Sequence, residues 1–337
     1  MCAVPSIGVV SLASDWSEGS FILGCGTFGG IGGSPSLVGH GLQEEAARAV
    51  MDEAVALGIT LFDTAENYAG GLGESMIGRW MADRGPAVAG RVRIATKVAP
   101  PRGEDAGRRF DGAFLEEKFA GSLGRLGVES VEQLLTHAQH DDTPIEETLE
   151  GLEAIRESGR CTFVGACNVD ADQLTSALLT AERLGFNRYH VVQNGYSLLA
   201  PDDDHAVRSI CRDHGIAFTP FSPFAGGALT GKYNRSEAPP PDSRLALRPD
   251  GVDELLTPAA HDAIDRLRAR AEQQHGVRCG ALALAWLLHN PDVTAVVTGP
   301  SRTSPHLDLA AQALDTTLTA DETIEIRSWF ERSADET

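Results

Sequence analysis

The sequence predicts a parallel (β/α)8 TIM barrel with additional carboxy-terminal helices. Two observations support this fold class: short apolar runs typical of buried strands alternate with segments of helical periodicity, and the strands in this alternation number eight. Repeated βα units of this number and length fit a closed barrel better than a six-stranded doubly wound sheet, and an open sheet is the alternative. We expect a single barrel domain over residues 1–337, with residues 1–20 as an irregular lead-in.

Each predicted strand is a short, mostly apolar run. The first strand is followed by the loop Cys25–Gly41, which is rich in glycine and has no periodicity; a long loop of this kind is usually functional or mobile. In chain order, the eight strands are expected at Phe21–Gly24, Ile59–Phe62, Arg91–Val98, Val131–His137, Cys161–Asn168, Tyr189–Asn194, Ile216–Phe221 and Thr294–Val297.

The segments between the strands carry apolar residues at helical spacing. Glu44–Leu57 follows this spacing up to Gly58, which is a typical helix stop, and another helix is expected after the glycines at 70–73. Further helices are expected at Gly112–Leu126, Ile145–Ser158, Ala171–Leu184, Asp203–His214, Pro258–His275, Gly280–His289, Ser304–Ala313 and Thr319–Arg332.

Composition argues against several classes of partner. The chain has 28 basic and 48 acidic residues, and the net charge of −20 opposes binding to nucleic acid or to anionic membrane surfaces. No apolar stretch reaches membrane-spanning length, and the amino terminus lacks the pattern of an export signal. The six cysteines show no C-x-x-C spacing, so we expect a reduced, cytoplasmic protein.

Polar residues stand at the ends of several predicted strands. In a barrel of this type the carboxyl ends of successive strands converge on one face, so these side chains should meet there. Taken alone, Asp63 could cap a turn, Tyr68 could be a half-buried aromatic, and His137 could be a hydrogen-bonded structural histidine. Lys97 ends an apolar strand, where a charge needs a partner. The set at this face is Asp63, Tyr68, Lys97, His137, Asn168, Gln193 and Phe221.

Several motifs resemble the aldo-keto reductase superfamily in order, from about Phe21 to Ala313. The long seventh loop and Ser243-Arg244 are most similar to the branch that includes potassium-channel β subunits and bacterial aryl-alcohol-type reductases. The matching motifs are Asp63-Thr64-Ala65 with Tyr68, Thr96-Lys97, Leu135-Thr136-His137, Val164-Gly165-Ala166-Cys167-Asn168, Val192-Gln193-Asn194-Gly195-Tyr196-Ser197 and the segment from Phe221 to Tyr233.

The resemblance implies a barrel that binds an extended nicotinamide cofactor and reduces a small-molecule aldehyde or ketone. No G-x-G-x-x-G motif opens a helix, so a Rossmann site is not expected. By position, Asp63, Tyr68, Lys97 and His137 would form the catalytic tetrad. Hydride delivery to a carbonyl builds an alkoxide, so a proton donor must lie nearby, and we expect Lys97 to pull down the pKa of Tyr68 for this task.

The cofactor contacts implied by the resemblance follow the later strands. Cys167, where a serine is common, would lie beside two amides that hold the carboxamide, and Phe221, where a tyrosine is common, would stack on the nicotinamide ring. We favour NADPH because Arg302 could bind a 2′-phosphate, and NADH stays open because the usual Glu-Asn pair falls on Leu309 and Ala310. The full set is Cys167, Asn168, Gln193, Phe221, Ser222, Phe224, Gly226, Lys232, Arg244, Gly299, Ser301 and Arg302.

Other interpretations remain open at this stage. The channel-associated branch suggests a nucleotide-binding regulatory subunit with little turnover, and by analogy a ring-shaped homo-oligomer. The glycine-rich loop suggests a ketoreductase of bacterial secondary metabolism that tailors natural products or deoxysugars. His137, His140 and Asp141 could suggest a metal, but Lys97 would repel a cation, so we expect none. Candidate substrate-pocket residues are Phe28, Trp80 and Tyr196, together with the carboxy-terminal loops, and the sequence does not tell which of them reach the site. Helix packing is the favoured interpretation of Trp80.

Overall fold

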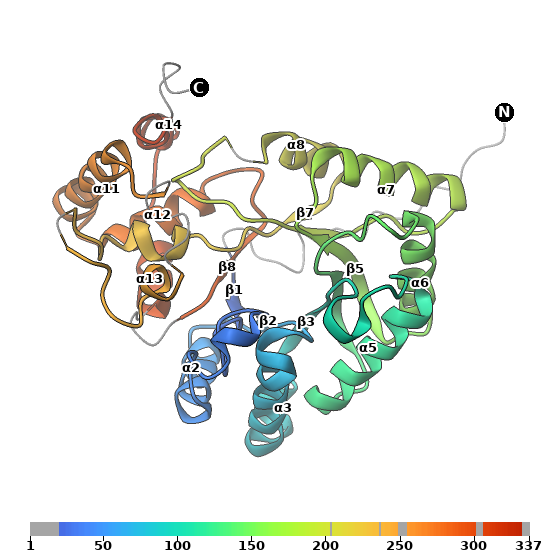
Figure 1. Cartoon of the computed structure of the whole chain (residues 1–337). Coiled ribbons are helices and arrows are strands. Elements are labelled where there is room, and N and C mark those ends of the chain that lie inside the picture. Colours follow the sequence, from blue (N-terminus) through green and yellow to red (C-terminus); the bar gives the residue numbers. More distant parts are fainter. Residues whose placement is uncertain (1–19, 203, 236, 249–254, 301–305, 332–337) are drawn as a thin grey trace.

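A computed structural model describes residues 20–202, 204–235, 237–248, 255–300 and 306–331, and in it eight parallel strands form the wall of a barrel (Figure 1). The strands are hydrogen-bonded in the order β7-β6-β5-β4-β3-β2-β1-β8. Their bounds are β1 Ser20–Gly24, β2 Leu61–Asp63, β3 Arg93–Val98, β4 Val131–Thr136, β5 Cys161–Cys167, β6 Val191–Gln193, β7 Ala217–Phe218 and β8 Ala295–Thr298.

The two ends of this sheet come together and close the barrel. The backbone N–H of Thr294 donates to the carbonyl of Phe218 at 2.9 Å, and the N–H of Val297 donates to the carbonyl of Pro220 at 2.9 Å. These bonds join the β8 segment to the β7 segment, while β8 also pairs with β1. The predicted (β/α)8 barrel is therefore confirmed.

Helices surround the strands, as Figure 1 shows, and at least one helix separates each strand from the next along the chain. The α-helices are α2 Glu44–Ala56, α3 Leu72–Arg84, α4 Pro86–Ala89, α5 Gly112–Leu126, α6 Ile145–Glu157, α7 Ala171–Leu184, α8 His205–His214, α9 Arg244–Leu247, α11 Pro258–Arg270, α12 Cys279–Leu288, α13 His306–Leu314 and α14 Ala320–Ser328. The shorter turns are η1 Pro35–Leu37, η2 Tyr68–Gly71, η3 Gly103–Asp105, η4 Ala225–Thr230 and η5 Ala271–His275.

The structure refines two expected boundaries. The helix predicted at Pro258–His275 is α11 followed by the π-helical turn η5, which ends at Gly276 in the left-handed region (φ 64°). The strand predicted at Ile216–Phe221 is Ala217–Phe218, although Thr219 and Phe221 still donate backbone hydrogen bonds to Val192 and Asn194 at 2.9 Å each. The lead-in proposed for residues 1–20 lies almost entirely outside the described residues.

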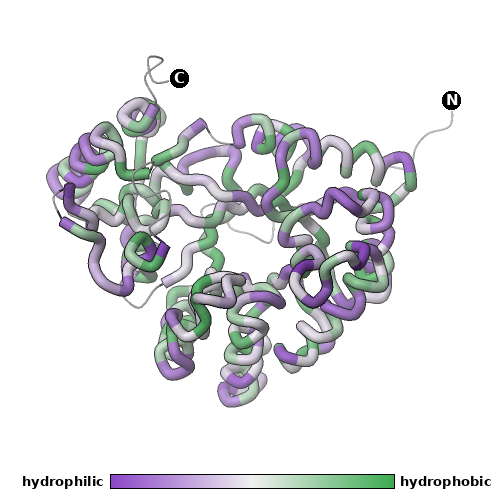
Figure 2. Tube along the Cα trace, viewed as in Figure 1, coloured by the Kyte–Doolittle hydropathy of each residue, from purple (hydrophilic) through white to green (hydrophobic). Residues whose placement is uncertain are grey.

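Two apolar layers hold the barrel together. One fills its interior and consists of Ile22, Leu61, Ala95, Leu135, Phe163, Val191, Ala217, Ala295 and Val297. The other, larger layer lies between the strands and the surrounding helices, with Phe62, Leu134 and Trp80 among its members. Figure 2 shows hydrophobic segments where helices face the strands and hydrophilic segments on outer turns. Each strand thus buries both faces, as parallel barrel strands do.

Candidate active site

Alternation along the strands directs the predicted polar residues into one space. Successive side chains on a strand point to opposite faces, so a residue two positions beyond an interior residue points the same way. The interior residues concerned are Leu61, Ala95, Leu135 and Val191. The residues two positions later are Asp63, Lys97, His137 and Gln193. These side chains therefore meet at the carboxyl-terminal mouth of the barrel, where the apolar filling ends.

A buried ion pair lies at the floor of this space. The Nζ atom of Lys97 donates to both carboxylate oxygens of Asp63, at 2.6 and 2.7 Å, and to the carbonyl of Thr64 at 3.0 Å. Gln193 Nε2 donates to the same carboxylate at 3.0 Å. Burial alone would lower the pKa of Lys97, but Asp63 opposes this and the net pKa lies above its ordinary value. Lys97 is thus held charged and in one position.

Tyr68 lies directly above this pair. It begins the turn η2, and the Lys97 Nζ atom is 5.2 Å from the centroid of its ring. The ring of His137 meets it edge-on, with centroids 5.4 Å apart and an interplanar angle of 73°. Gly26 lies against the phenol, since a Cβ there would be 3.6 Å from Tyr68 Cζ. The structure therefore brings together the four residues expected to form a tetrad.

The protonation states at this site differ from one sequence-based expectation. Burial raises the pKa of Tyr68 to about 12 and outweighs the Lys97 ammonium, which on its own would lower it. The expected net lowering of this pKa is therefore wrong for the structure, because removing the phenol from water penalises the phenolate more than one ammonium favours it. Burial, with the charge of Lys97 as a smaller cause, lowers the pKa of His137 to about 3. Both side chains are neutral at physiological pH.

A second buried carboxylate, which the sequence did not reveal as part of the site, fixes the helix behind Tyr68. Glu74 in the first turn of α3 accepts a hydrogen bond from Thr96 Oγ1 at 2.6 Å and one from Arg125 Nε at 2.7 Å. Thr96 precedes Lys97 on β3, so this contact joins the segment that carries Tyr68 to the strand that carries Lys97. The only sequence signal was an acid near the start of an expected helix.

Two amides and a thiol lie beside the ion pair. Asn168, at φ 54° just beyond β5, donates from Nδ2 to the His137 carbonyl at 2.9 Å and to Cys167 Sγ at 3.1 Å. Within the described residues its amide oxygen accepts no hydrogen bond. The same holds for the amide oxygen of Gln193, whose Nε2 atom is bonded to Asp63. Left-handed backbone at a residue other than glycine is costly and often marks a functional position.

These residues open into a cavity of about 950 Å³. Lys97 lies beneath the cavity floor and does not line it. The predicted site residues that line the cavity are Asp63, Tyr68, His137, Cys167, Asn168, Gln193, Phe221, Ser222, Phe224, Gly226, Lys232, Arg244 and Gly299. Ser301 and Arg302 lie outside the described residues, so the structure places neither.

Cations gather on the rim formed by the segment after β7. Lys232 and Arg244 line the cavity together with Arg248, which the sequence analysis missed. Among the described residues none of the three forms an ion pair with a carboxylate. Burial lowers the pKa of Lys232, and burial followed by the neighbouring charge of Arg248 lowers that of Arg244. Such cations gain stability when an anion binds beside them.

None of the three aromatic candidates for the substrate pocket lines the cavity, and helix packing, the other interpretation of Trp80, is confirmed. Phe28 and Trp80 are fully buried, and Trp80 donates from Nε1 to Asp52 at 3.0 Å on the inner face of α3. Tyr196 is buried against Trp286, with ring centroids 5.8 Å apart. A single sequence does not show whether an aromatic side chain points into the cavity or into the core between strand and helix. Residues lining the cavity that the sequence analysis missed include Thr27, Asn67 and Arg102.

No cluster of three metal-ligating side chains occurs among the residues that the structure describes. His140, which the sequence raised as a candidate ligand, instead pairs through Nδ1 with Thr143 Oγ1 at 2.9 Å. Leu309 and Ala310, which occupy the positions of the usual adenine-binding pair, are buried in the core. In the described part of the chain, no helix is long and apolar enough to cross a membrane.

Comparison with known proteins agrees with this geometry. The model of the "Aldo/keto reductase family" matches residues 22–331. The chain belongs to the aldo/keto reductase family.

Three relatives illustrate the range of this family around the chain. A probable voltage-gated potassium channel subunit beta of Arabidopsis thaliana is 33% identical over 276 residues, covering 79% of this chain and 81% of that protein. The uncharacterized oxidoreductase YrpG of Bacillus subtilis is 33% identical, covering 82% and 84%. The L-glyceraldehyde 3-phosphate reductase of Escherichia coli is 31% identical, covering 82% and 81%. The predicted aldo-keto reductase resemblance, with its channel-associated branch, is confirmed.

Proposed function

We propose that this chain reduces an aldehyde or ketone to an alcohol, with a nicotinamide nucleotide as hydride donor and Tyr68 as proton donor. Family membership and the oxidoreductase relatives support general carbonyl reduction by the chain. The observation that supports the specific mechanism is a phenol kept protonated above a buried ammonium at the floor of a large cavity. A carbonyl reductase needs a neutral acid at this point.

The tetrad residues have distinct roles in this proposal. Tyr68 donates its hydroxyl proton to the carbonyl oxygen as negative charge develops there. The phenolate that results is stabilised by Lys97, whose ammonium Asp63 holds in place. His137 is neutral, so its ring can donate a hydrogen bond to the substrate oxygen without supplying a competing proton. The buried pair thus acts through the phenol rather than on the substrate.

The cavity residues fit a nicotinamide nucleotide. The amide oxygens of Asn168 and Gln193, unbonded within the described residues, can accept from a carboxamide, and the ring of Phe221 offers a face for stacking. Lys232 and Arg244 carry charge without a carboxylate partner among the described residues and suit a pyrophosphate or phosphate. When bound, the nucleotide supplies the hydride. We propose NADPH because of Arg302, and NADH is the alternative tested below.

A regulatory role is the second candidate, because one relative is a probable potassium channel β subunit. In that case the nucleotide would bind tightly and turn over slowly. The test is a fluorescence titration with NADPH and NADH, followed by steady-state oxidation of the preferred nucleotide with a panel of aldehydes and ketones. Turnover with at least one carbonyl supports the reductase. Tight binding without turnover across the panel contradicts it and favours the regulatory candidate. Binding of NADPH at least about tenfold tighter than NADH supports phosphate recognition.

A further inference from the structure

One guanidinium at the cavity mouth has no role in the proposed chemistry. Arg102 lies on the loop between β3 and α5 and lines the cavity beside Asn67 and Pro100. It makes no ion pair with any described carboxylate, whereas Arg108 and Arg109 on the same loop pair with Glu117 and Glu147. Like Lys232 and Arg244, Arg102 thus lines the cavity with a charge that no carboxylate among the described residues pairs with.

Arg102 and Asn67 lie side by side against Gly33. A Cβ atom at Gly33 would lie 2.7 Å from Asn67 Nδ2 and 3.0 Å from an Arg102 terminal nitrogen, so both nitrogens are close to the Gly33 backbone and to each other. The side-chain oxygen of Asn67 is buried without a hydrogen-bond partner, and within the described residues its amide nitrogen has none either. Two groups that can donate hydrogen bonds therefore lie side by side in the cavity wall without an acceptor among the described side chains.

The acids of the cavity lie elsewhere. Among the described residues two carboxylates line it: Asp63, which is paired with Lys97, and Asp242, which lies on the segment of Arg244. Arg102 is also near the proposed reaction centre, since its charge is one of the causes that lower the pKa of His137. The part of the cavity wall formed by Arg102 and Asn67 is thus electropositive, and it belongs to the same cavity as Tyr68 and His137.

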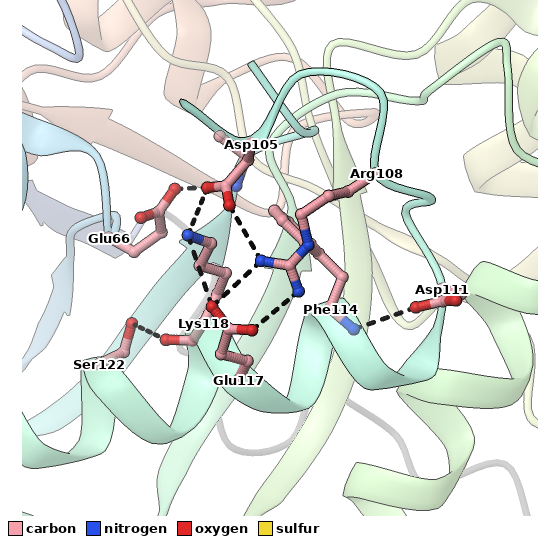
Figure 3. Close-up of polar contacts among 9 residues, drawn as sticks. Glu66, Asp105, Arg108, Asp111, Phe114, Glu117, Lys118 and Ser122 are labelled. Carbon is pink, nitrogen blue, oxygen red and sulfur yellow. Dashed lines mark hydrogen bonds and ion pairs between the residues drawn. The ribbon is translucent and has the colours of Figure 1, made fainter. Parts of the chain in front are cut away.

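A network of ion pairs holds the loop that carries Arg102 (Figure 3). Arg102 precedes the turn η3, and its carbonyl accepts from the N–H of Asp105 at 3.1 Å. Asp105 in turn pairs with Lys118 of α5 at 2.5 Å and with Arg108 at 2.9 Å. Arg108 lies over the ring of Phe114, with its guanidinium carbon 4.7 Å from the centroid. These contacts fix the backbone of Arg102 relative to α5.

We propose that Arg102 and Asn67 bind an anionic group, a carboxylate or a phosphate, carried by the carbonyl substrate itself. This inference rests on the proposed reductase function and names the substrate class of the same site. The guanidinium can bind either oxyanion in a forked arrangement, and the Asn67 amide adds a third donor. The anion would fix the substrate so that its carbonyl oxygen lies near Tyr68 and His137.

The test compares matched pairs of substrates that differ in one anionic group. Benzaldehyde is set against 4-carboxybenzaldehyde, and glyceraldehyde against glyceraldehyde 3-phosphate, with wild-type protein, Arg102→Gln and Arg109→Gln. Arg109→Gln is the control because it removes the same charge from the same loop but lies outside the cavity lining. In wild-type protein, kcat/KM for at least one anionic partner should exceed that of its neutral partner by about tenfold, mostly through KM. Arg102→Gln should bring that ratio close to one, and Arg109→Gln should leave it unchanged.

The outcomes separate this inference from the proposed function. Turnover of the neutral aldehydes with a ratio near one in wild-type protein, or a ratio that Arg102→Gln does not change, overturns the anion site and leaves the reductase standing. A preference confined to one pair identifies carboxylate or phosphate as the source. If no aldehyde is reduced, calorimetric titration of 4-(hydroxymethyl)benzoate against benzyl alcohol gives a readout without turnover. Tighter binding of the anion that is lost in Arg102→Gln supports the site, and equal binding overturns it.

Discussion

The floor and the rim of the cavity differ in whether their charged side chains are paired. On the floor, Lys97 and Asp63 form two short hydrogen bonds with each other, so each charge is neutralised by the other. On the rim, Lys232 and Arg244 are partly buried cations without a carboxylate partner among the described residues. The floor is therefore arranged before any ligand arrives, and the rim gains stability only when an anion binds. Chemistry and binding are assigned to different parts of the same cavity.

The largest expected effect comes from breaking the floor. Lys97→Met leaves the Asp63 carboxylate buried with Gln193 as its one remaining donor among the described residues, and should lower the free energy of unfolding by about 3–5 kcal/mol. It should also lower kcat by about 10³-fold or more, because the phenolate loses its counter-charge. Urea denaturation and steady-state kinetics measure the two effects.

A double variant separates stability from chemistry on the floor. Lys97→Met combined with Asp63→Asn removes the isolated charge and should recover most of the lost stability while activity stays low. Recovery of activity together with stability would show that the pair has only a structural role.

Substitutions on the rim should change the affinity for the nucleotide rather than stability or kcat. Arg244→Met should weaken NADPH binding by about 10- to 100-fold, since a hydrogen bond to a charged group contributes about 1.5–3 kcal/mol. At saturating nucleotide kcat should change little, and the unfolding free energy should not fall. Fluorescence titration measures the affinity. Arg235→Gln is the matched control because Arg235 lies on the same segment but pairs with Asp262. An equal loss of affinity in both variants would mean that only overall charge matters.

A smaller effect concerns stability in acid. The folded-state pKa of His137, about 3, lies below the ordinary value of 6.5, so the folded protein resists a proton that the unfolded chain accepts. The stabilising contribution is complete above pH 6.5 and is lost as the pH falls towards 3. Between pH 6 and pH 4, wild-type protein should lose about 1 kcal/mol per pH unit more than His137→Gln. Parallel slopes in urea denaturation would contradict a neutral, buried imidazole.

The smallest expected effect is on the pH dependence of catalysis. Because the pKa of Tyr68 is raised to about 12 and that of His137 is lowered to about 3, neither group titrates near neutrality in the free protein. The profile of kcat/KM should therefore be flat between pH 5 and pH 9 with a substrate that does not itself ionise. An inflection in that range that disappears in Tyr68→Phe or His137→Gln would show that the phenol or the imidazole is poised to titrate.

The same contrast explains what the sequence could predict. Floor residues such as Asp63, Lys97 and Gln193 end strands, and regular alternation carries each of them into the barrel mouth. Arg102 and Arg248 sit on irregular loops, whose path depends on contacts such as Asp105 with Lys118 that join distant segments. Sequence spacing does not encode such contacts.

Burial was the other quantity that the sequence could not provide. Phe28 and Tyr196 were candidates for the pocket, yet they pack in the core. The pKa of Tyr68 was expected to fall because a lysine lies nearby, and it rises because desolvation of the phenol is the larger effect. Both errors arise because a single sequence shows which residue types are present but does not show how deeply each side chain is buried from water.

The central claim is that Tyr68 donates a proton and does not hold the nucleotide. The most direct measurement is NADPH affinity and single-turnover reduction of an aldehyde by Tyr68→Phe, with wild-type protein alongside. The variant keeps the ring that contacts Gly26 and His137 and removes only the hydroxyl. We predict unchanged affinity and a rate lower by about 10²- to 10⁴-fold. A variant that reduces the aldehyde at close to the wild-type rate would contradict the assignment.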